Sequence, residues 1–216
     1  MFFTKKEILP ISLIIAAFIL GIVLSPYLSD LVPSHWNAQG QIDDWSSKEF
    51  IIFFFPVFAL LIYLLMTFLP LIDPLKKNYS SFSDAYFWLR TFFTAFFIAL
   101  YLFMLSAGLG FFLNVTLFMP ILFSLLFIIL GVFMPKIKKN YFVGIKTPWT
   151  IHSEQVWDKT HEFSGKLYIV TGLLSLLGIF AQDYAFFIFI SLAILSAVIS
   201  AAYSYIVFKR LKGFEN

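Results

Sequence analysis

The sequence predicts an all-α membrane protein with six transmembrane helices, both termini in the cytoplasm, and a short amphipathic cytoplasmic helix before the fifth span. Three observations predict this class. Hydrophobic residues make up 61% of the chain and charged residues only 12%, whereas a soluble domain carries about a quarter charged residues. The apolar residues form runs long enough to cross a bilayer. Basic residues flank these runs mainly on one side.

The apolar runs define the first four spans. A helix rises about 1.5 Å per residue and the hydrocarbon core is about 30 Å thick, so one crossing needs about 20 residues. Residues 8–28 and 50–72 each supply one crossing. Residues 91–135 carry no charge and are about twice as long as one crossing requires. They predict a helical hairpin that turns near residues 108–114, where Gly108, Gly110 and Asn114 lie.

Charges are rare within the predicted spans. Asp183 is the only charge in residues 167–208, and this run predicts a second hairpin that turns at Gln182, Asp183 and Tyr184. Arg90 lies near the start of the third span beside Trp88, and we expect it to snorkel to the cytoplasmic interface. No span centre carries Asp, Glu, Lys or His, which argues against a proton-coupled transporter.

The basic residues orient the six helices. With both termini inside, all 15 Lys and Arg residues except Lys48 lie on the cytoplasmic side, as the positive-inside rule requires. Acidic residues such as Asp43 and Asp44 collect on the opposite side. The net charge of +3 does not indicate nucleic-acid binding, because the basic residues flank apolar runs. The sequence therefore predicts a multi-pass protein of a cytoplasmic membrane.

The chain contains no Cys, which excludes disulfides, zinc thiolate sites, thiol catalysis and prenylation. We expect no metal and no cofactor. The pair His161 and Glu162 lacks the second His four residues further on, so the zinc protease motif is absent. In the predicted topology His35 lies across the membrane from His152 and His161, so the three cannot form one cluster.

The predicted outside segment, residues 25–49, combines turn residues with two Trp and a His. One interpretation is an interfacial loop whose Trp36 and Trp45 lie at the depth of the lipid headgroups. The other is a binding surface for an extracellular ligand. Its polar anchors would be His35, Asp43 and Asp44.

The predicted inside segment, residues 136–150, is basic and aromatic, and residues 151–165 follow as the amphipathic helix. Its apolar face is formed by Val156, Trp157 and Phe163, and its acidic edge by Glu154, Asp158 and Glu162. One interpretation is an interfacial helix with its Lys cluster near anionic lipids. The other is a docking surface for a cytoplasmic partner.

Two helix starts can be placed from capping residues. Ser46 or Ser47 can cap the second span, because a side-chain oxygen at this position accepts a free backbone N–H of the first turn. Thr150 or Ser153 can cap the amphipathic helix in the same way.

The outside segment resembles the N-terminal membrane domain of unknown function found in the SdpI-like family. That pattern has a Pro, a His-Trp-Asn, a Gly, an Asp and a Lys just before the second helix. The matching residues, which we expect to bind an outside ligand, are Pro33, His35, Trp36, Asn37, Gly40, Asp43, Trp45 and Lys48.

The inside segment resembles the second signature of the same family. Lys146 departs from it, since Arg is expected more often there, and Lys lacks the planar bidentate fork of Arg. The two motifs occupy the right places in the topology and cover nearly the whole chain. The matching residues, which we expect to bind an inside partner, are Asn140, Gly144, Lys146, Thr147, Pro148, Trp149, Trp157 and His161.

The resemblance implies a two-helix membrane unit over residues 1–80 and a four-helix unit over residues 81–216, joined in one membrane body. SdpI-like proteins are six-helix proteins associated with immunity of a producing cell against a secreted antimicrobial peptide toxin, and with signalling of the toxin to a cytoplasmic repressor. The resemblance therefore implies a non-enzymatic immunity protein of the bacterial cytoplasmic membrane. Its partners would be membrane lipid, a secreted peptide toxin and a cytoplasmic transcriptional repressor, without direct contact to nucleic acid.

Two other classes of function remain open at this point. A small transporter or permease would use the polar loops as gates, although no line of polar residues crosses the spans. A membrane enzyme acting at the outer face would use His35 as base with Asp43 as its partner, although no nucleophile or second base accompanies them in a fixed pattern.

Overall fold

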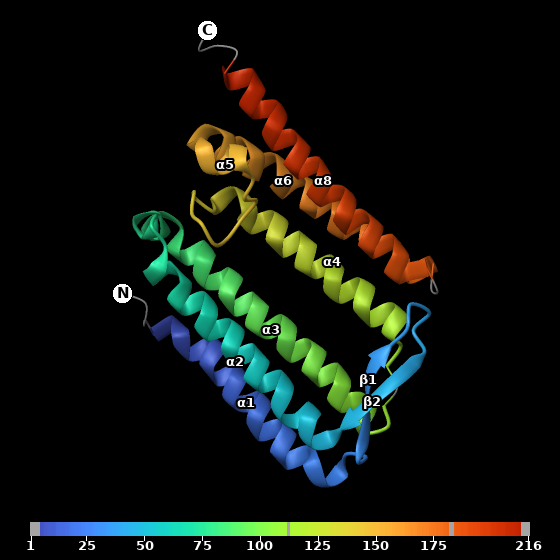
Figure 1. Ribbon diagram of the computed structural model, residues 1–216. Helices are drawn as coiled ribbons and strands as arrows, with labels where there is room; N and C mark the ends of the chain where they lie inside the picture. Colours follow the sequence, from blue (N-terminus) through green and yellow to red (C-terminus); the bar gives the residue numbers. More distant parts are fainter. Residues whose placement is uncertain (1–4, 112, 182–183, 213–216) are drawn as a thin grey trace. The chain divides into compact units, whose positions relative to one another are not determined.

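The computed structural model describes residues 5–111, 113–181 and 184–212, and its regular structure is helical apart from one β-hairpin (Figure 1). It confirms the all-α membrane class, because six described helices are long and apolar enough to cross a membrane. These are α1 (Ile8–Leu24), α2 (Lys48–Ile72), α3 (Ser83–Gly108), α4 (Val115–Phe133), α6 (Glu154–Ser175) and α8 (Ala185–Lys212). The shorter elements are strands β1 (Leu31–Trp36) and β2 (Ile42–Ser47), helices α5 (Pro148–His152) and α7 (Gly178–Ala181), and 3-10 turns at Lys5–Glu7, Ser25–Tyr27, Lys76–Phe82 and Met134–Lys136. The orientation in the membrane stays a prediction.

The turn between α3 and α4 is confirmed. Gly110 has a φ of 84°, a backbone conformation that glycine adopts without steric cost. The Asn114 side chain accepts the Thr116 N–H at 2.9 Å and so satisfies a donor in the first turn of α4. In the second predicted turn, Gln182 and Asp183 lie outside the described residues.

The chain forms two compact units. Unit 1 comprises the residues up to Phe68 together with Arg90–Met119, and unit 2 comprises Leu69–Leu89 together with the residues from Pro120 onward. Helices α2, α3 and α4 therefore each contribute to both units. The division at residue 80 expected from the sequence groups the chain differently, and it stays a prediction.

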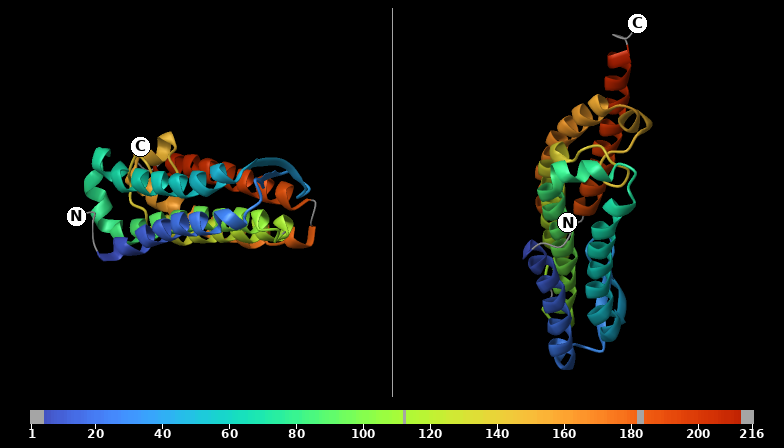
Figure 2. Two further views of the ribbon diagram at one scale, coloured as in Figure 1. Left: turned by 90° about the horizontal axis from the view of Figure 1, so that it is seen from below. Right: turned by 90° about the vertical axis from the view of Figure 1, so that its left-hand side faces the viewer.

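In unit 1, α1 and the parts of α2 and α3 that belong to it run alongside one another, and the hairpin follows at one end (Figures 1 and 2). Gly21 on α1 permits a close approach, because a Cβ there would overlap the Tyr101 hydroxyl on α3. Small residues allow membrane helices to pack at short range. The buried core that results consists of Ala17, Leu28, Val32, Ile51, Ile52, Tyr101, Met104 and Leu105.

In unit 2, α6 packs against α8 and α5 contacts both (Figure 2). The backbones of α4 and α6 also approach closely at two glycines. A Cβ added to Gly131 would lie 2.6 Å from the Gly165 carbonyl oxygen, and one added to Gly165 would lie 2.8 Å from that of Gly131. Only glycine permits this crossing.

The expected amphipathic helix over residues 151–165 is divided. Its beginning belongs to the short helix α5, and residues from Glu154 onward form the first turns of α6, the fifth span. Ser153 separates the two with extended backbone (φ −131°, ψ 128°), and its side chain caps α6 by accepting the Val156 N–H. Because the cap restarts the helix at once, no loop is needed, and the apolar face continues directly into the span.

Candidate functional site

The segment expected to be an outside loop is a β-hairpin. β1 and β2 pair antiparallel, with Leu31 opposite Ser47, Val32 opposite Ser46 and Pro33 opposite Trp45. The sequence analysis expected a loop and did not predict the strands, because the apolar–polar alternation is short and Pro33 interrupts it, and Pro weakens a strand prediction. The register is irregular on both sides of His35.

Asn37 and Gly40 build the turn of the hairpin. The Asn37 side-chain oxygen accepts the N–H groups of Gln39 and Gln41, both at 3.0 Å. Gly40 has a φ of 79°, and a Cβ there would lie 2.6 Å from the Thr116 side chain at the start of α4. These two predicted site residues therefore determine the shape of the hairpin tip.

Part of strand β1 packs on the helices of unit 1. Val32 and Pro33 are buried, and the Trp36 ring lies 5.1 Å from the Phe103 ring, measured between centroids. Phe103 in turn stacks on Phe118 at 4.4 Å. Trp36 thus holds the hairpin against α3, and the burial of apolar surface stabilises that arrangement.

The exposed surface of the hairpin is formed by His35 and strand β2, and it carries acid and aromatic groups. His35 Nδ1 and Asp43 Oδ1 lie 2.6 Å apart, with side-chain exposures of 66% and 41%. Asp44 is exposed, and Trp45 keeps 48% of its surface accessible. An exposed indole beside two carboxylates is a surface that can contact a ligand through apolar and ionic interactions together.

Asp30 and Lys48 fasten the base of the hairpin. Lys48 Nζ donates to Asp30 Oδ1 at 2.8 Å, and the Lys48 N–H donates to the Asp30 carbonyl at 3.0 Å. The hydrogen bond from Lys48 and its charge lower the pKa of Asp30. Ser47 caps α2 by accepting the Phe50 N–H at 3.2 Å, which confirms one of the two expected capping residues. Asp30 was absent from the predicted site, since its pairing depends on the hairpin.

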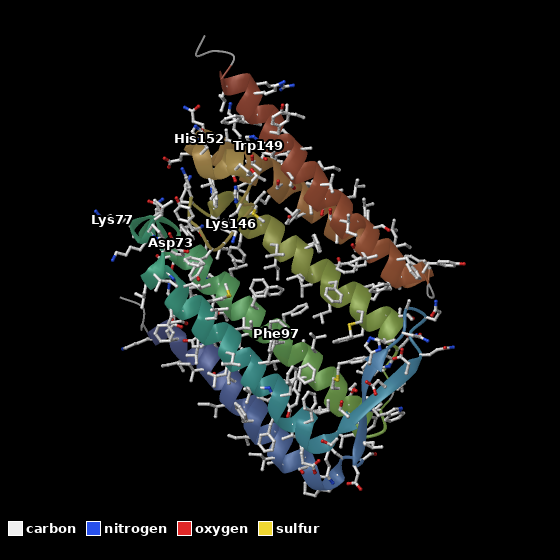
Figure 3. All side chains as sticks on the ribbon, viewed as in Figure 1. Asp73, Lys77, Phe97, Lys146, Trp149 and His152 are labelled. Atoms are coloured by element: carbon white, nitrogen blue, oxygen red, sulfur yellow. The ribbon has the colours of Figure 1, made fainter. Side chains whose placement is uncertain are left out.

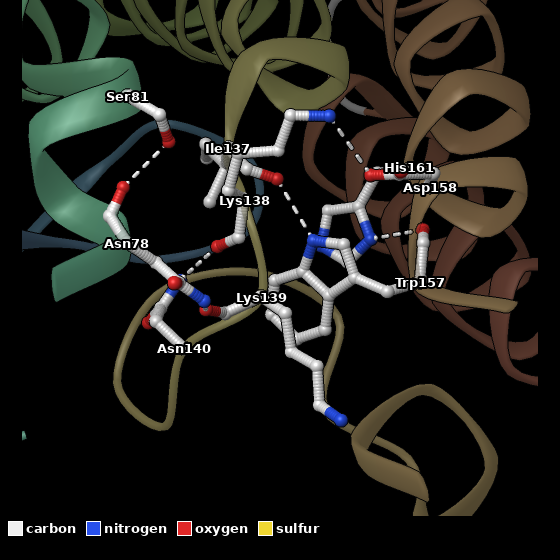
Figure 4. Close-up of polar contacts among 9 residues, drawn as sticks. All are labelled: Asn78, Ser81, Ile137, Lys138, Lys139, Asn140, Trp157, Asp158 and His161. Atoms are coloured by element: carbon white, nitrogen blue, oxygen red, sulfur yellow. Dashed lines mark hydrogen bonds and ion pairs between the residues drawn. The ribbon is translucent and has the colours of Figure 1, made fainter. Parts of the chain in front are cut away.

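In unit 2, the basic loop, residues 137–147, is organised around Asn140, which is fully buried. Its side-chain oxygen accepts the N–H groups of Phe142 and Val143 and lies 3.2 Å from the Tyr79 hydroxyl oxygen. Its amide nitrogen donates to the Lys138 carbonyl (Figure 4) and to the Val143 carbonyl. All the hydrogen-bonding capacity of this side chain is used within the protein, so its role in the structure is to shape the loop.

Trp157 and His161 form the inner wall of the basic loop, and both are fully buried. Trp157 Nε1 donates to the Ile137 carbonyl at 2.8 Å (Figure 4). His161 Nε2 accepts the Ile145 N–H at 3.0 Å, and its Nδ1 lies 2.8 Å from the Trp157 carbonyl. Since Nε2 accepts, the hydrogen bonds assign the proton to Nδ1.

Gly144 passes directly over these two rings. Its φ is 118°, and a Cβ there would lie 2.5 Å from His161 Nε2 and 3.1 Å from the Trp157 ring. Thr147 caps α5 in a reciprocal box with Thr150, each side-chain oxygen accepting the other residue's N–H. These predicted residues therefore support the loop from within.

Three predicted residues of the basic loop region reach the surface. Lys146 and Pro148 are exposed, and Lys146 Nζ donates to the Phe142 carbonyl at 2.8 Å. Trp149 is half-buried against Tyr205, with centroids 4.9 Å apart. Lys146 and Trp149 lie at the same end of unit 2 as Asp73, Lys77 and His152 (Figure 3). This is the part of the loop that a partner can reach.

Asp73 is a polar hub that the sequence interpretation missed. It is 2% exposed, and its carboxylate accepts the N–H groups of Leu75 and Tyr141 and the hydroxyl of Tyr79. It thereby ties the basic loop to the end of α2. The signal available was the Asp-Pro step at the end of an apolar run, because Asp favours a local turn there.

Arg90 corrects a second expectation. It is 3% exposed rather than extended toward an interface. It pairs with Glu7 at 2.5 Å, donates to Thr67 at 2.9 Å, and lies over the Tyr63 ring at 5.0 Å. The snorkelling expectation was wrong because a carboxylate from α1's leading turn is within reach, and a buried pair avoids leaving a lone charge in an apolar environment.

The described residues contain no group of three or more His, Asp or Glu side chains arranged to hold a metal ion. The fold is that of a multi-pass membrane protein with six helices that can span a membrane. It has two polar candidate surfaces: the hairpin between α1 and α2, and the basic loop before α6, the fifth span.

Comparison with known proteins gives the family. The SdpI/YfhL protein family model matches residues 136–205, and a domain of unknown function, DUF1648, matches residues 12–60. The chain is 32% identical over 213 residues to Immunity protein SdpI of Bacillus subtilis (strain 168), covering 97% of this chain and 99% of that protein. No solved structure matches the chain. The chain belongs to the SdpI/YfhL family and is a multi-pass protein of the bacterial plasma membrane, which confirms the resemblance stated above.

Proposed function

We propose that this chain is a non-enzymatic immunity protein that protects its cell against a secreted peptide toxin. The observation that carries the proposal is the identity of 32% along nearly the whole length of a protein named for immunity. The match includes both the hairpin region and the basic loop region. A peptide toxin at the membrane surface is an amphipathic ligand, and the exposed hairpin face offers apolar and ionic groups together.

The eight hairpin residues divide into two roles in this proposal. His35, Asp43 and Trp45 contact the toxin, because their side chains are exposed. The remaining residues give the hairpin its shape and position. They are Pro33, Trp36, Asn37, Gly40 and Lys48.

The finer part of the proposal is signalling to a cytoplasmic repressor. In the predicted topology the basic loop faces the cytoplasm, and Lys146, Pro148 and Trp149 are the positions that a repressor would contact. The remaining members of the motif keep the loop in shape: Asn140, Gly144, Thr147, Trp157 and His161. Signalling further requires that the toxin bind two arrangements of the protein with unequal affinity.

Expression of the chain in a toxin-sensitive strain tests the proposal. We expect survival at toxin concentrations that kill the parent strain. Trp45→Ala should reduce that protection, whereas Tyr27→Ala, which removes another exposed aromatic, should not. Membrane abundance of each variant is measured alongside. Unchanged killing at full membrane abundance of the native chain would contradict the immunity proposal for that toxin.

Repressor binding is tested separately by co-purification from membranes with and without toxin. Lys146→Ala and Trp149→Ala should weaken capture of the repressor while leaving survival unchanged. A repressor captured equally by these variants would contradict the assigned contact surface.

A further inference from the structure

The two strands of the hairpin differ in how much of them is covered. β1 and β2 pair only with each other among the described residues, so each strand has one open edge. β1 is buried at Val32 and Pro33, whereas β2 is exposed at Asp43, Asp44, Trp45 and Ser47. An open strand edge presents unpaired backbone groups and is a place where another chain can add.

The register shows which backbone groups face the open edges. The Lys48 N–H donates to the Asp30 carbonyl, so residues 30 and 48 form a hydrogen-bonded pair. In an antiparallel ladder such pairs alternate with pairs whose N–H and C=O groups point outward. Leu31 with Ser47 and Pro33 with Trp45 are therefore the outward-pointing pairs. The N–H groups of Trp45 and Ser47 face the open edge of β2.

The open edge of β1 is blocked. Pro33 occupies an outward-pointing position and has no N–H to donate. The strand is irregular directly after it, and its middle is buried against the helices. A third strand can therefore be added only along β2.

Asp44 protects the open edge of β2. Its carboxylate accepts the Trp45 N–H at 2.8 Å, which occupies the group that an incoming strand would use. Charged side chains on edge strands commonly prevent unwanted pairing. Since Asp44 is exposed, its side chain can rotate away when a partner strand supplies a carbonyl instead.

The charges of β2 select the partner. Asp43 and Asp44 directly precede the exposed Trp45, so the complementary segment carries basic side chains together with apolar ones. A second copy of β2 would place carboxylates against carboxylates, which is destabilising across strands. We propose that the open edge of β2 binds an extended, basic and apolar segment of a peptide as a third strand, with Asp44 as a displaceable guard of the Trp45 N–H. The identity of that peptide as the toxin rests on the proposed function.

A synthetic peptide of alternating Lys and Val tests strand addition. The full-length protein is placed in nanodiscs of neutral lipid, which prevents adsorption of the peptide to anionic headgroups. We expect slower hydrogen exchange of the Trp45 and Ser47 amides when the peptide is present. The same peptide with alternate amides N-methylated on the edge that faces β2 should bind at least about tenfold more weakly, because it loses several backbone hydrogen bonds.

Equal binding of the N-methylated peptide would overturn the proposal, since recognition would then involve side chains only. Equal binding of a peptide of alternating Glu and Val would overturn the selection by charge. Chemical cross-links between Trp45 regions of two copies, formed in place of peptide binding, would overturn the choice of occupant.

Two variants at one position isolate the backbone contribution. Trp45→Ala and Trp45→Pro both remove the indole, but only proline removes the outward N–H. We expect the Pro variant to bind the Lys-Val peptide about two- to tenfold more weakly than the Ala variant. Protected amides at Ser46 and Lys48 show that the hairpin persists. If the Ser46 and Lys48 amides exchange freely in the Pro variant, the hairpin has opened, and the comparison with the N-methylated peptide alone tests backbone pairing.

Asp44→Ala tests the guard with an uncharged peptide of alternating Thr and Val. Because the variant frees the Trp45 N–H and no charge attraction is lost with this peptide, binding should strengthen about two- to tenfold. Weaker binding would overturn the guard. Failure of the survival assay with intact strand addition would contradict the immunity proposal alone, and loss of strand addition with intact survival would contradict this inference alone.

Discussion

Arg90 and Glu7 form a buried ion pair in unit 1, with Arg90 Nη2 2.5 Å from Glu7 Oε1 and side-chain exposures of 4% and 8%. Glu7 lies directly before α1, and Arg90 lies on α3. Tyr63 donates its hydroxyl to the second Glu7 oxygen at 2.8 Å. The pair connects residues that are 83 positions apart and so fastens the start of α1 to the rest of the unit.

Removal of one partner of this pair should be strongly destabilising. Glu7→Ala leaves the Arg90 charge buried without its carboxylate, at an expected loss of about 3–5 kcal/mol. The double variant Glu7→Leu with Arg90→Met should recover most of that loss, because both charges are removed together. Denaturant titration of the purified protein in detergent measures both.

The exposed pair of Lys166 and Glu162 is the matched control. Glu162→Ala should change the free energy of unfolding by less than about 1 kcal/mol, since exposed pairs are screened by water. A similar loss for Glu7→Ala and Glu162→Ala would contradict a structural role for the buried pair.

Gly144→Ala should disrupt the basic loop. A Cβ at this position meets His161 Nε2 at 2.5 Å and requires a φ of 118°, so both overlap and backbone strain oppose the change. We expect a loss of about 3 kcal/mol or more. Accelerated hydrogen exchange at the Ile145 amide, which donates to His161, is the local measurement.

Gly110→Ala separates strain from overlap. Gly110 also has a positive φ, but an added Cβ meets nothing within 4 Å. This variant should lose only about 1–2 kcal/mol from the left-handed conformation. Equal losses of unfolding free energy in the two variants would show that the Trp157 and His161 rings move aside for the new Cβ, and would contradict the expected overlap.

Gly165→Ala should force α4 and α6 apart, because its Cβ would lie 2.8 Å from the Gly131 carbonyl and from Pro135. Overpacking of this kind costs about 1–3 kcal/mol. Gly178→Ala is the control, since its Cβ would meet its neighbours at 3.3 Å or more. Thermal unfolding of the two variants in the same detergent compares their unfolding midpoints. Equal midpoints for Gly165→Ala and Gly178→Ala would contradict close packing at Gly165.

Asp30 makes the base of the hairpin sensitive to acid. Lys48 donates a hydrogen bond to Asp30 and lowers its pKa, so the pairing is fully present above the ordinary Asp value of about 3.9. It is lost as the pH falls through the lowered value. Carbon NMR of the Asp30 carboxyl should show this low titration.

Lys48→Met should return the Asp30 titration toward the ordinary value, because both causes of the shift are removed. Lys76→Met changes a basic residue in unit 2 and should leave the Asp30 titration unchanged. An Asp30 titration that is the same in the native protein and in Lys48→Met would contradict the ion pair.

The six spans and the turn between α3 and α4 could be predicted from the sequence alone, because the length of an apolar run and the position of Gly110 are local properties. The motif positions in the hairpin and the basic loop were also recognisable without coordinates. Their division into exposed contacts and buried supports was not, since Trp45 and Trp157 are the same residue type and differ only in what packs around them.

The hairpin was missed because strand pairing requires a partner strand, and Pro33 weakens the local pattern. Asp73 and His161 became supporting residues only when backbone groups from other parts of the sequence approached them. Hydropathy and local spacing thus predict which segments enter the membrane. Tertiary packing alone decides that Arg90 pairs with Glu7 and that Trp45 stays exposed, because burial and long-range hydrogen bonds depend on neighbours far away in the sequence.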